Sequence, residues 1–259
     1  MKILLLDVET SPNKAYIWRM YQEIKSTTFL VETWFILCWC AKWLDKKEMM
    51  HGSIHESSTY KKDPENDKEI LIKLQKLLNE ADIVIAHNGQ NFDCKKIRTR
   101  FIMNDIKPAS PYRILDTLKE ARATFSFMSN RLNDLGTFLK VGKKIDTGGF
   151  DLWKKCLNGD KTAWKKMLKY CKQDVILLEK VYKKLRPFIK QHPNIGIYSD
   201  DIKPLCPKCG SNKIWYRGYA YTTSSKFRRF QCISCGGWGR KKQNLLSKNK
   251  KYNLTTNII

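Results

Sequence analysis

Residues 1–12, MKILLLDVETSP, form an apolar run that ends in acidic residues. A short apolar run of this kind, closed by Pro12, is typical of a buried β-strand. Because side chains two residues apart point to the same face of a strand, Asp7 and Glu9 present both carboxylates to one side. The stretch therefore predicts a buried strand that carries an acidic pair at its end.

The spacing of this acidic pair is not rare in the chain. Residues 63–65 and 67–69 repeat the Asp-x-Glu pattern. Both repeats fall where we expect the exposed start of a helix, and acidic side chains are favourable there because the N-terminal end of a helix is partly positive. The pair at Asp7 and Glu9 follows an apolar run instead, so we single it out as a candidate site.

Strand and helix patterns alternate through the first part of the chain. Short runs rich in apolar, β-branched and aromatic residues indicate strands, whereas apolar residues three and four positions apart indicate amphipathic helices. Strands first, then helices alternating with strands, predict an α/β fold with a mixed β-sheet flanked by helices. The further predicted strands cover residues 29–43, 48–54, 83–86 and 113–115, and the predicted helices cover residues 64–80, 94–103, 131–139 and 162–185.

The charge of the chain favours a polyanionic partner. Its 259 residues include 49 Lys plus Arg against 25 Asp plus Glu, a formal net charge of +24. Nucleic acid is the first partner that such a charge favours, and an anionic membrane surface is the second. The longest apolar run, residues 34–41, is far shorter than the about 20 residues of a membrane-spanning helix, so we expect no membrane partner. The first residues lack a signal-peptide pattern, which favours a cytoplasmic location.

Four of the nine cysteines form two close pairs near the C-terminus. Cys206 and Cys209 lie in CPKCG, Cys232 and Cys235 lie in CISCG, and 22 residues separate the pairs. Two residues between the cysteines of a pair let both sulfurs face one tetrahedral ion, and four thiolates leave no open position for catalysis. The spacing predicts one structural Zn²⁺ in a small zinc ribbon, with two redox-active Cys-x-x-Cys pairs as the alternative.

Aromatic and basic residues are interleaved between and beside these cysteine pairs. Bases stack on aromatic rings and phosphates pair with cations, so this composition indicates nucleic-acid binding. We expect about half of the aromatic residues to form the core of so small a module instead. The candidate substrate-binding residues are Trp215, Arg217, Lys226, Arg228 and Arg229.

Two further motifs carry acidic residues. HNGQNFD, residues 87–93, follows a predicted strand and places Asp93 at the start of a helix, where a helix cap is the alternative interpretation. Tyr170 and Asp174 lie four residues apart, and so on one face, of the predicted helix 162–185. Periodicity leaves open whether that face points to the core or whether Asp174 is exposed.

Together the three motifs resemble those of the DEDD superfamily of 3′-5′ exonucleases, which have a ribonuclease H-like fold. The tyrosine places the resemblance in the tyrosine subgroup, with the proofreading exonuclease domains of family B DNA polymerases and with stand-alone enzymes, many of them phage-encoded. The resemblance extends over residues 1–190. The motifs are DVET with Asp7 and Glu9, the N-x3-FD pattern from Asn88 to Asp93, and Y-x3-D with Tyr170 and Asp174.

The resemblance implies two Mg²⁺ or Mn²⁺ ions in the site. Converging carboxylates repel one another unless cations neutralise them, and hard oxygen ligands suit these two metals. Two such ions clamp the attacking and the leaving oxygen of a phosphodiester. By the resemblance, Asp7 bridges both ions and Asp93 supports the second ion. Glu9 and Asp174 complete the site of the attacking water.

The same resemblance assigns supporting roles. Tyr170 orients the attacking water, since a phenol with a pKa of about 10 is a poor base at neutral pH. Asn88 contacts the substrate or positions Asp93. We interpret His87, beside Asn88, as a structural hydrogen-bonding residue, and for Asp116 we favour a helix cap over a place next to the metal ligands.

We therefore expect a metal-dependent 3′-5′ exonuclease that releases nucleoside monophosphates from single-stranded 3′ ends, with DNA favoured over RNA. An exoribonuclease is one alternative, and a non-catalytic, zinc-dependent nucleic-acid binder or scaffold is the other. A replication or repair protein is a further expected partner through the ribbon, and the sequence leaves the oligomeric state open. A phage-encoded protein of this kind would act in the host cytoplasm. The expected domains are an exonuclease domain over residues 1–199, a zinc ribbon over 200–240 and a basic, mobile tail over 241–259.

Overall fold

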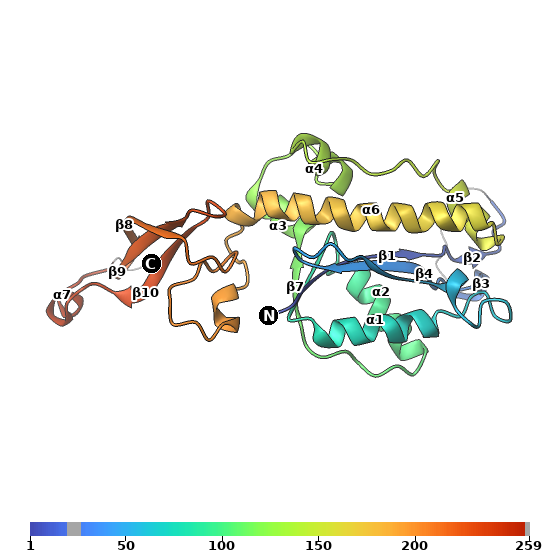
Figure 1. Cartoon of the computed structure of the whole chain (residues 1–259), viewed down its shortest axis with the longest axis horizontal. Helices are drawn as coiled ribbons and strands as arrows, with labels where there is room; N and C mark the ends of the chain where they lie inside the picture. The colour runs from blue at the N-terminus through green and yellow to red at the C-terminus, as the bar shows by residue number, and fades with distance from the viewer. Residues whose placement is uncertain (20–26, 257–259) are drawn as a thin grey trace. The chain divides into compact units, whose positions relative to one another are not determined.

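The computed structural model describes residues 1–19 and 27–256. The chain forms two compact units, one of Lys2–Tyr182 and one of Lys183–Ile259 together with Met1 (Figure 1). The three-part division expected from the sequence, with a boundary at residue 200, remains a prediction. Of the helices within the described ranges, none combines the length and the apolarity that crossing a bilayer requires.

A mixed β-sheet of five strands forms the centre of the first unit. The order across the sheet is β5 (Met50–Ser53), β4 (Ile36–Trp43), β1 (Ile3–Thr10), β6 (Ile83–Ala86) and β7 (Arg113–Asp116). β1 pairs antiparallel with β4 and parallel with β6, so the sheet changes direction at β1. β1, the first strand in the sequence, is therefore the middle strand of the sheet.

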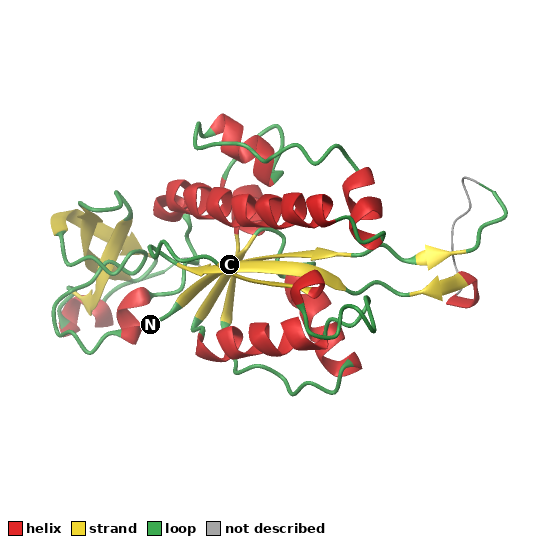
Figure 2. Ribbon diagram, turned by 45° about the vertical axis from the view of Figure 1, so that its right-hand side comes forward, coloured by secondary structure: helices red, strands yellow, loops and turns green. Residues whose placement is uncertain are grey.

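Helices cover both faces of this sheet (Figure 2). α6 (Lys161–Leu185) lies over one face, and α1 (Lys68–Glu80) and α2 (Asp93–Met103) lie over the other. The predicted α/β fold with a mixed sheet flanked by helices is thus confirmed. The unit also contains α3 (Thr117–Thr124), α4 (Leu132–Phe138), α5 (Asp151–Leu157), 3₁₀ helices at Thr27–Phe29 and Ile54–Glu56, and a two-stranded sheet of β2 (Lys14–Ala15) and β3 (Leu30–Glu32).

The apolar run at the start of the chain is explained by the position of β1. Leu4 and Leu5 are fully buried, because helices cover both faces of the central strand along its first half. Val84 and Ile85 of the neighbouring strand β6 are fully buried for the same reason. The second half of β1 then brings Asp7 and its neighbours to the edge of this core.

Three elements differ from their sequence-based prediction. The predicted strand 29–43 is interrupted before β4, where the amide of Phe35 donates to Ser11 Oγ at 2.9 Å. α3 and α5 were not predicted, because these helices have eight and seven residues and each buries only two, too few to show an apolar repeat.

Asp67 also departs from expectation, since residues 67–69 were expected to be exposed. The Asp67 side chain is fully buried and accepts hydrogen bonds from Arg100 Nε at 2.7 Å and Nη2 at 2.8 Å. It also accepts from the amide of Ile36 at 2.9 Å, which fixes the start of β4. A buried carboxylate is tolerated when a bidentate arginine and further donors satisfy it. Its partners are distant in the sequence, so the local pattern gives no sign of them.

The second unit is a small antiparallel sheet with the strand order β10-β9-β8. The strands are β8 (Ile214–Thr222), β9 (Ser225–Cys232) and β10 (Trp238–Asn244). β10 runs past residue 241, where the tail was expected to begin, and a short helix α7 (Lys248–Tyr252) follows. Two 3₁₀ helices, Arg186–Phe188 and Ile195–Tyr198, precede the sheet.

Candidate active site

Three of the acidic residues singled out from the sequence meet at the end of the central strand. Asp7 and Glu9 lie on β1, and Asp174 comes from α6, which covers that face of the sheet. One carboxylate oxygen of each lies within 4.8 Å of the others. Asp174 is 1% exposed, so its face of α6 points to the core, and the alternative of an exposed Asp174 is wrong.

Asp93 reaches the same strand from α2, which covers the other face of the sheet. It begins α2, and its Oδ1 accepts a hydrogen bond at 3.1 Å from the amide of Val8, the residue between Asp7 and Glu9. The residue at the cap position of α2 is Phe92, so Asp93 is not the helix cap. Within the described residues, Asp93 lies beside the 4.8 Å group and not in it.

Burial is the largest cause that raises the pKa of each of the four carboxyl groups. For Asp7, burial and then the charges of Glu9, Asp93 and Asp174 raise the pKa well above its usual range. Burial and the charge of Asp174 raise the pKa of Glu9 to about 8, and burial raises that of Asp93 to about 7. Burial also raises the pKa of Asp174. The ionised forms of these carboxyl groups are therefore unfavourable unless a cation neutralises them.

The donor set fits a divalent cation. Among the described residues, Oδ1 of Asp174 is a buried carboxylate oxygen with no hydrogen-bond partner. A buried oxygen of this kind is costly unless a donor or a metal satisfies it. Carboxylate oxygens are hard ligands that suit Mg²⁺ or Mn²⁺. Asp7, Glu9 and Asp174 can therefore hold such an ion, and Asp93 lies close enough to assist.

Lys144 is a residue of the site that the sequence did not reveal. Its Nζ donates to Asp174 Oδ2 at 2.5 Å and to the Tyr170 hydroxyl at 3.0 Å. Burial lowers the pKa of Lys144, but the charge of Asp174 and these hydrogen bonds outweigh it and raise the pKa above its usual value, so the ammonium stays charged. The backbone amide of Lys144 donates to Asn133 Oδ1 at 2.9 Å, which ties the segment before α5 to α4.

Tyr170 lies one helical turn before Asp174 on α6. Its ring packs edge-on against Trp153, with ring centres 6.3 Å apart, and its hydroxyl points to Lys144. Burial and the charge of Asp174 raise the pKa of Tyr170 above its usual value. The phenol is therefore neutral at physiological pH and can donate or accept a hydrogen bond in the cluster.

A family model described as the RNase_H superfamily matches residues 43–186. The chain belongs to this superfamily. Members are usually nucleases that use divalent metals, which supports a hydrolase that acts on nucleic acid. The matched range contains Asp93, Tyr170 and Asp174 and begins after Asp7 and Glu9.

One solved structure supports the RNase H-like fold of the first unit. The chain is similar to the family B DNA polymerase from the hyperthermophilic archaeon Pyrobaculum calidifontis, with a TM-score of 0.52 at 13% identity. The similarity covers 72% of this chain and 24% of the polymerase, so the chain spans about a quarter of the polymerase's length. At this identity the likeness shows the fold alone. A comparison with curated proteins finds no match.

The loop before α2 in the RNase H-like unit is held by Asp116. Asp116 accepts from the amides of Asn88 at 2.9 Å and Gln90 at 3.1 Å, and it also caps α3 by accepting from Leu118 and Lys119. Asn88 has a positive φ of 68°, a conformation that asparagine tolerates better than most residues. The loop geometry that delivers Asp93 to β1 therefore depends on this carboxylate.

His87, in the loop before α2, contacts one residue through each of its ring nitrogens. Its Nδ1 contacts Thr117 Oγ1 at 2.9 Å and its Nε2 contacts the carbonyl oxygen of Asn130 at 3.0 Å. Burial lowers the pKa of His87 to about 4, so the imidazole is neutral at physiological pH. These contacts agree with the interpretation of His87 as a structural hydrogen-bonding residue.

A basic cavity of about 600 Å³ is connected to the acidic cluster through Lys144, which lines it and donates to Asp174. It contains Lys144 together with Asn88 and His87 from the loop before α2. Arg122 and Arg131 add two guanidinium groups to its wall. The cavity places cations where a polyanionic strand that approaches the carboxylates would need them.

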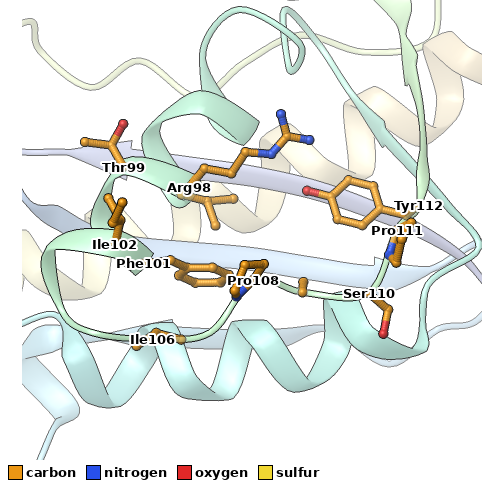
Figure 3. A pocket seen from close by; sticks show the side chains of 11 residues that line it. Arg98, Thr99, Phe101, Ile102, Ile106, Pro108, Ser110, Pro111 and Tyr112 are labelled. Carbon is orange, nitrogen blue, oxygen red and sulfur yellow. The ribbon is translucent and has the colours of Figure 1, made fainter.

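A second cavity, of about 730 Å³, lies between α2 and the segment 106–112 (Figure 3). Phe101, Ile106 and Pro108 are among its mostly apolar walls, and Arg98 is the one charged residue that lines it. Neither the four carboxylates nor Lys144 line this second cavity, so it forms no part of the acidic cluster.

The four cysteines of the second unit also converge. Their sulfurs lie within 4.8 Å of one another, with 3.7 Å between Cys206 and Cys235 and 3.6 Å between Cys209 and Cys232. Gly210 follows the first pair with a φ of +73°, a conformation that glycine adopts without strain. Four thiols at these distances fit one tetrahedral Zn²⁺.

The five basic and aromatic candidates of the ribbon do not share one face. Lys226 and Arg228 alternate with Arg229 along β9 and so point to opposite sides of the sheet. Trp215 lies opposite Gln231, on the same side as Arg229. The guanidinium of Arg217 lies 5.3 Å from the centre of the Trp215 ring.

Proposed function

We propose that the chain is a divalent-metal-dependent 3′-5′ exonuclease of the tyrosine subgroup of the DEDD superfamily, which releases nucleoside monophosphates and prefers DNA. The observation that carries this proposal is the convergence of Asp7, Glu9 and Asp174, with oxygens within 4.8 Å, beside Asp93. Acids from β1, α2 and α6 meet there although the sequence separates them widely.

The four carboxylates are the ligands of this site. Asp7, Glu9 and Asp174 would hold the divalent cations through their converging oxygens, and Asp93, which accepts from the amide of Val8, would assist them. A pair of Mg²⁺ or Mn²⁺ ions, when bound, supplies an activated water and neutralises charge on the phosphodiester. Burial and then the neighbouring carboxylates raise the pKa values of Asp7 and Glu9, and a divalent cation would relieve the repulsion between these acids.

The other residues of the cluster position these groups. Lys144 holds Asp174 and Tyr170 in one arrangement through its two hydrogen bonds. Tyr170 stays protonated and orients the attacking water without acting as its base. Asn88, Arg122 and the rest of the basic cavity contact the strand, largely without reading its sequence.

The ribbon contributes a structural zinc in this proposal. Four thiolates close the tetrahedron around Zn²⁺, so the metal holds the small sheet together and performs no hydrolysis. Nucleic acid is the partner that the basic ribbon fits, and a replication or repair protein is a second partner.

A labelled-strand assay tests the activity and its direction. A single strand labelled at its 5′ end should shorten in a ladder of one-nucleotide steps when Mg²⁺ or Mn²⁺ is added. A strand labelled at its 3′ end should release the label as a mononucleotide at once. Matched DNA and RNA strands decide the substrate, with faster loss of DNA expected. Tight binding of the strand without metal-dependent shortening would contradict the proposal and would favour a non-catalytic nucleic-acid binder.

A further inference from the structure

Two exposed tryptophans lie in one row across the sheet of the second unit. Trp215 of β8 and Trp238 of β10 both pair with Gln231 of the middle strand β9. Residues paired across neighbouring strands point to the same face, and two strand spacings put the tryptophan backbones about 10 Å apart. Trp215 is 52% exposed and Trp238 is 42% exposed. One face of the sheet thus presents two large aromatic rings to solvent.

A guanidinium group lies over each of the two rings. Arg217 lies 5.3 Å from the ring centre of Trp215, and Arg229 lies 4.9 Å from that of Trp238. Arg229 Nε also donates to the carbonyl oxygen of Arg217 at 3.0 Å, which holds the Arg229 side chain against the backbone of the neighbouring strand β8. This face therefore combines stacking surfaces with phosphate-binding charges, the two components of sites for single-stranded nucleic acid.

The row is anchored to the cysteine cluster. The side-chain amide of Gln231 donates to the carbonyl oxygen of Gly236 at 3.3 Å, next to Cys235. Cys232 follows Gln231 directly in β9. The two tryptophans therefore lie on a sheet whose end is held by the four cysteines. Side chains on a rigid sheet lose less conformational entropy when they bind a strand.

The opposite face of the same sheet provides an internal comparison. Tyr219 and Tyr221 lie there along one strand, and the ammonium of Lys226 lies 4.0 Å from the centre of the Tyr219 ring, closer than either arginine lies to its tryptophan. The rings of Tyr219 and Tyr221 are also tilted against each other at 6.5 Å. The tryptophan face has the larger rings, and they lie across three strands, so it is the better stacking surface.

We infer that Trp215 and Trp238 form a binding platform for single-stranded nucleic acid, in which two bases stack on the indole rings while Arg217 and Arg229 contact the phosphates. The inference rests on the proposed function only in taking a nucleic-acid strand as the substrate. Because every base has a π-face, the platform accepts all sequences and rejects duplexes, whose bases are already stacked.

Binding to a full-length, inactive protein tests the platform. All variants carry Asp7→Asn to prevent hydrolysis, and fluorescence anisotropy measures affinity for a labelled single strand, the matching duplex and an abasic strand of equal length. Trp215→Ala and Trp238→Ala should each weaken single-strand binding by about 5-fold to 100-fold, the effect of losing one stacked base. Neither should change binding of the abasic strand, which has the phosphates but no bases.

Matched controls separate stacking from charge and from folding. Tyr221→Ala on the opposite face should leave single-strand affinity within about twofold, and Trp→Phe at either platform position should retain most of it. Arg229→Ala should lower the slope of log affinity against log salt by about 0.7, the loss of one phosphate contact on a single strand. The thermal transition and zinc content of each variant show whether it is folded.

Two results would overturn the inference. One is unchanged single-strand affinity in a folded Trp215→Ala, Trp238→Ala double variant, which would leave this face to a protein partner. The other is an equal loss of affinity for the abasic strand. Since binding is measured without hydrolysis, either result leaves the exonuclease proposal standing. Conversely, absence of cleavage by the wild-type protein leaves the platform standing.

Discussion

Lys144 Nζ lies 2.5 Å from Asp174 Oδ2, inside a cluster that otherwise holds four carboxyl groups. The same ammonium donates to Tyr170, so one cation connects both residues of the motif on α6. A charge-assisted hydrogen bond to a carboxylate that is 1% exposed is strong because little solvent screens it. Lys144 is therefore an integral part of the cluster, held by hydrogen bonds to both Asp174 and Tyr170.

Replacing Lys144 tests this role. Lys144→Gln keeps much of the side-chain volume but removes the charge that orients Asp174 and Tyr170. We expect kcat to fall by about 10-fold to 100-fold with a smaller change in KM, because the residue positions groups more than it binds substrate. Steady-state kinetics on a single strand measures both constants. Lys143→Gln, at the exposed neighbouring position, should leave both unchanged. A large loss in that control instead would point to a general effect of charge.

The carboxyl cluster predicts a pH-dependent stability in the absence of Mg²⁺. Glu9 has a usual pKa of 4.5 and a raised pKa of about 8 in the folded chain. A group whose pKa is raised on folding stabilises the fold below its unfolded pKa and loses this contribution as pH rises through its folded pKa. Glu9→Gln, which cannot ionise, should therefore be more stable than wild type at pH 8, by a few kcal/mol, and the difference should shrink toward pH 5.

Thermal unfolding at pH 5, 7 and 8 in Mg²⁺-free buffer checks the sign. Adding Mg²⁺ should raise the melting temperature of the wild type and have much less effect on the variant, since the ions bind the folded cluster. A variant less stable than wild type at pH 8 would show that burial and the charge of Asp174 do not raise the pKa of Glu9.

Asp116 is predicted to support the site without binding metal. Its side chain is 6% exposed and satisfies four backbone amides, two in the loop before α2 and two at the start of α3. Asp116→Ala leaves these donors unpaired and should lower the free energy of unfolding by about 2 to 4 kcal/mol. Urea unfolding measures this change. An unaltered stability would mean that water replaces the carboxylate in this loop.

The cysteine cluster is predicted to bind one zinc ion per chain. Cys232→Ser should abolish the bound zinc and the thermal transition of the second unit, because the metal supplies folding free energy to so small a sheet. Metal analysis and circular dichroism measure the two effects. Cys94→Ala, which changes a cysteine of α2, should retain the zinc. Full zinc content in Cys232→Ser would contradict a four-thiolate site.

Local pattern was sufficient to predict the elements that form the centre of the fold. The apolar runs of β1 and β6 are fully buried strands, and the predicted helix 162–185 is α6 within one residue. Asp7 and Glu9 were singled out because they share one face of a predicted buried strand, whereas Asp174 was assigned through the resemblance of the three motifs taken together. Their convergence depends on the packing of α6 along the face of the sheet that contains β1, which no local pattern reveals.

Residues whose role depends on distant partners could not be predicted in this way. Lys144 lies in an irregular segment, and in a chain with 49 Lys plus Arg nothing local distinguishes it from a surface lysine. Asp67 was expected to be exposed because its partner Arg100 is 33 residues away. The row of Trp215 and Trp238 depends on the register of three strands, which spacing along the sequence does not reveal.

The central claim is that the acids at the end of β1 perform metal-dependent hydrolysis. The most direct measurement is the rate at which the 3′-terminal nucleotide is released in Mg²⁺ by wild type, Asp7→Asn and Asp63→Asn. The two variants alter the same Asp-x-Glu pattern, but Asp63 is exposed and outside the cluster. The account predicts rapid release by wild type and Asp63→Asn, and a rate about a thousandfold lower for Asp7→Asn. Equal rates for Asp7→Asn and wild type would contradict it.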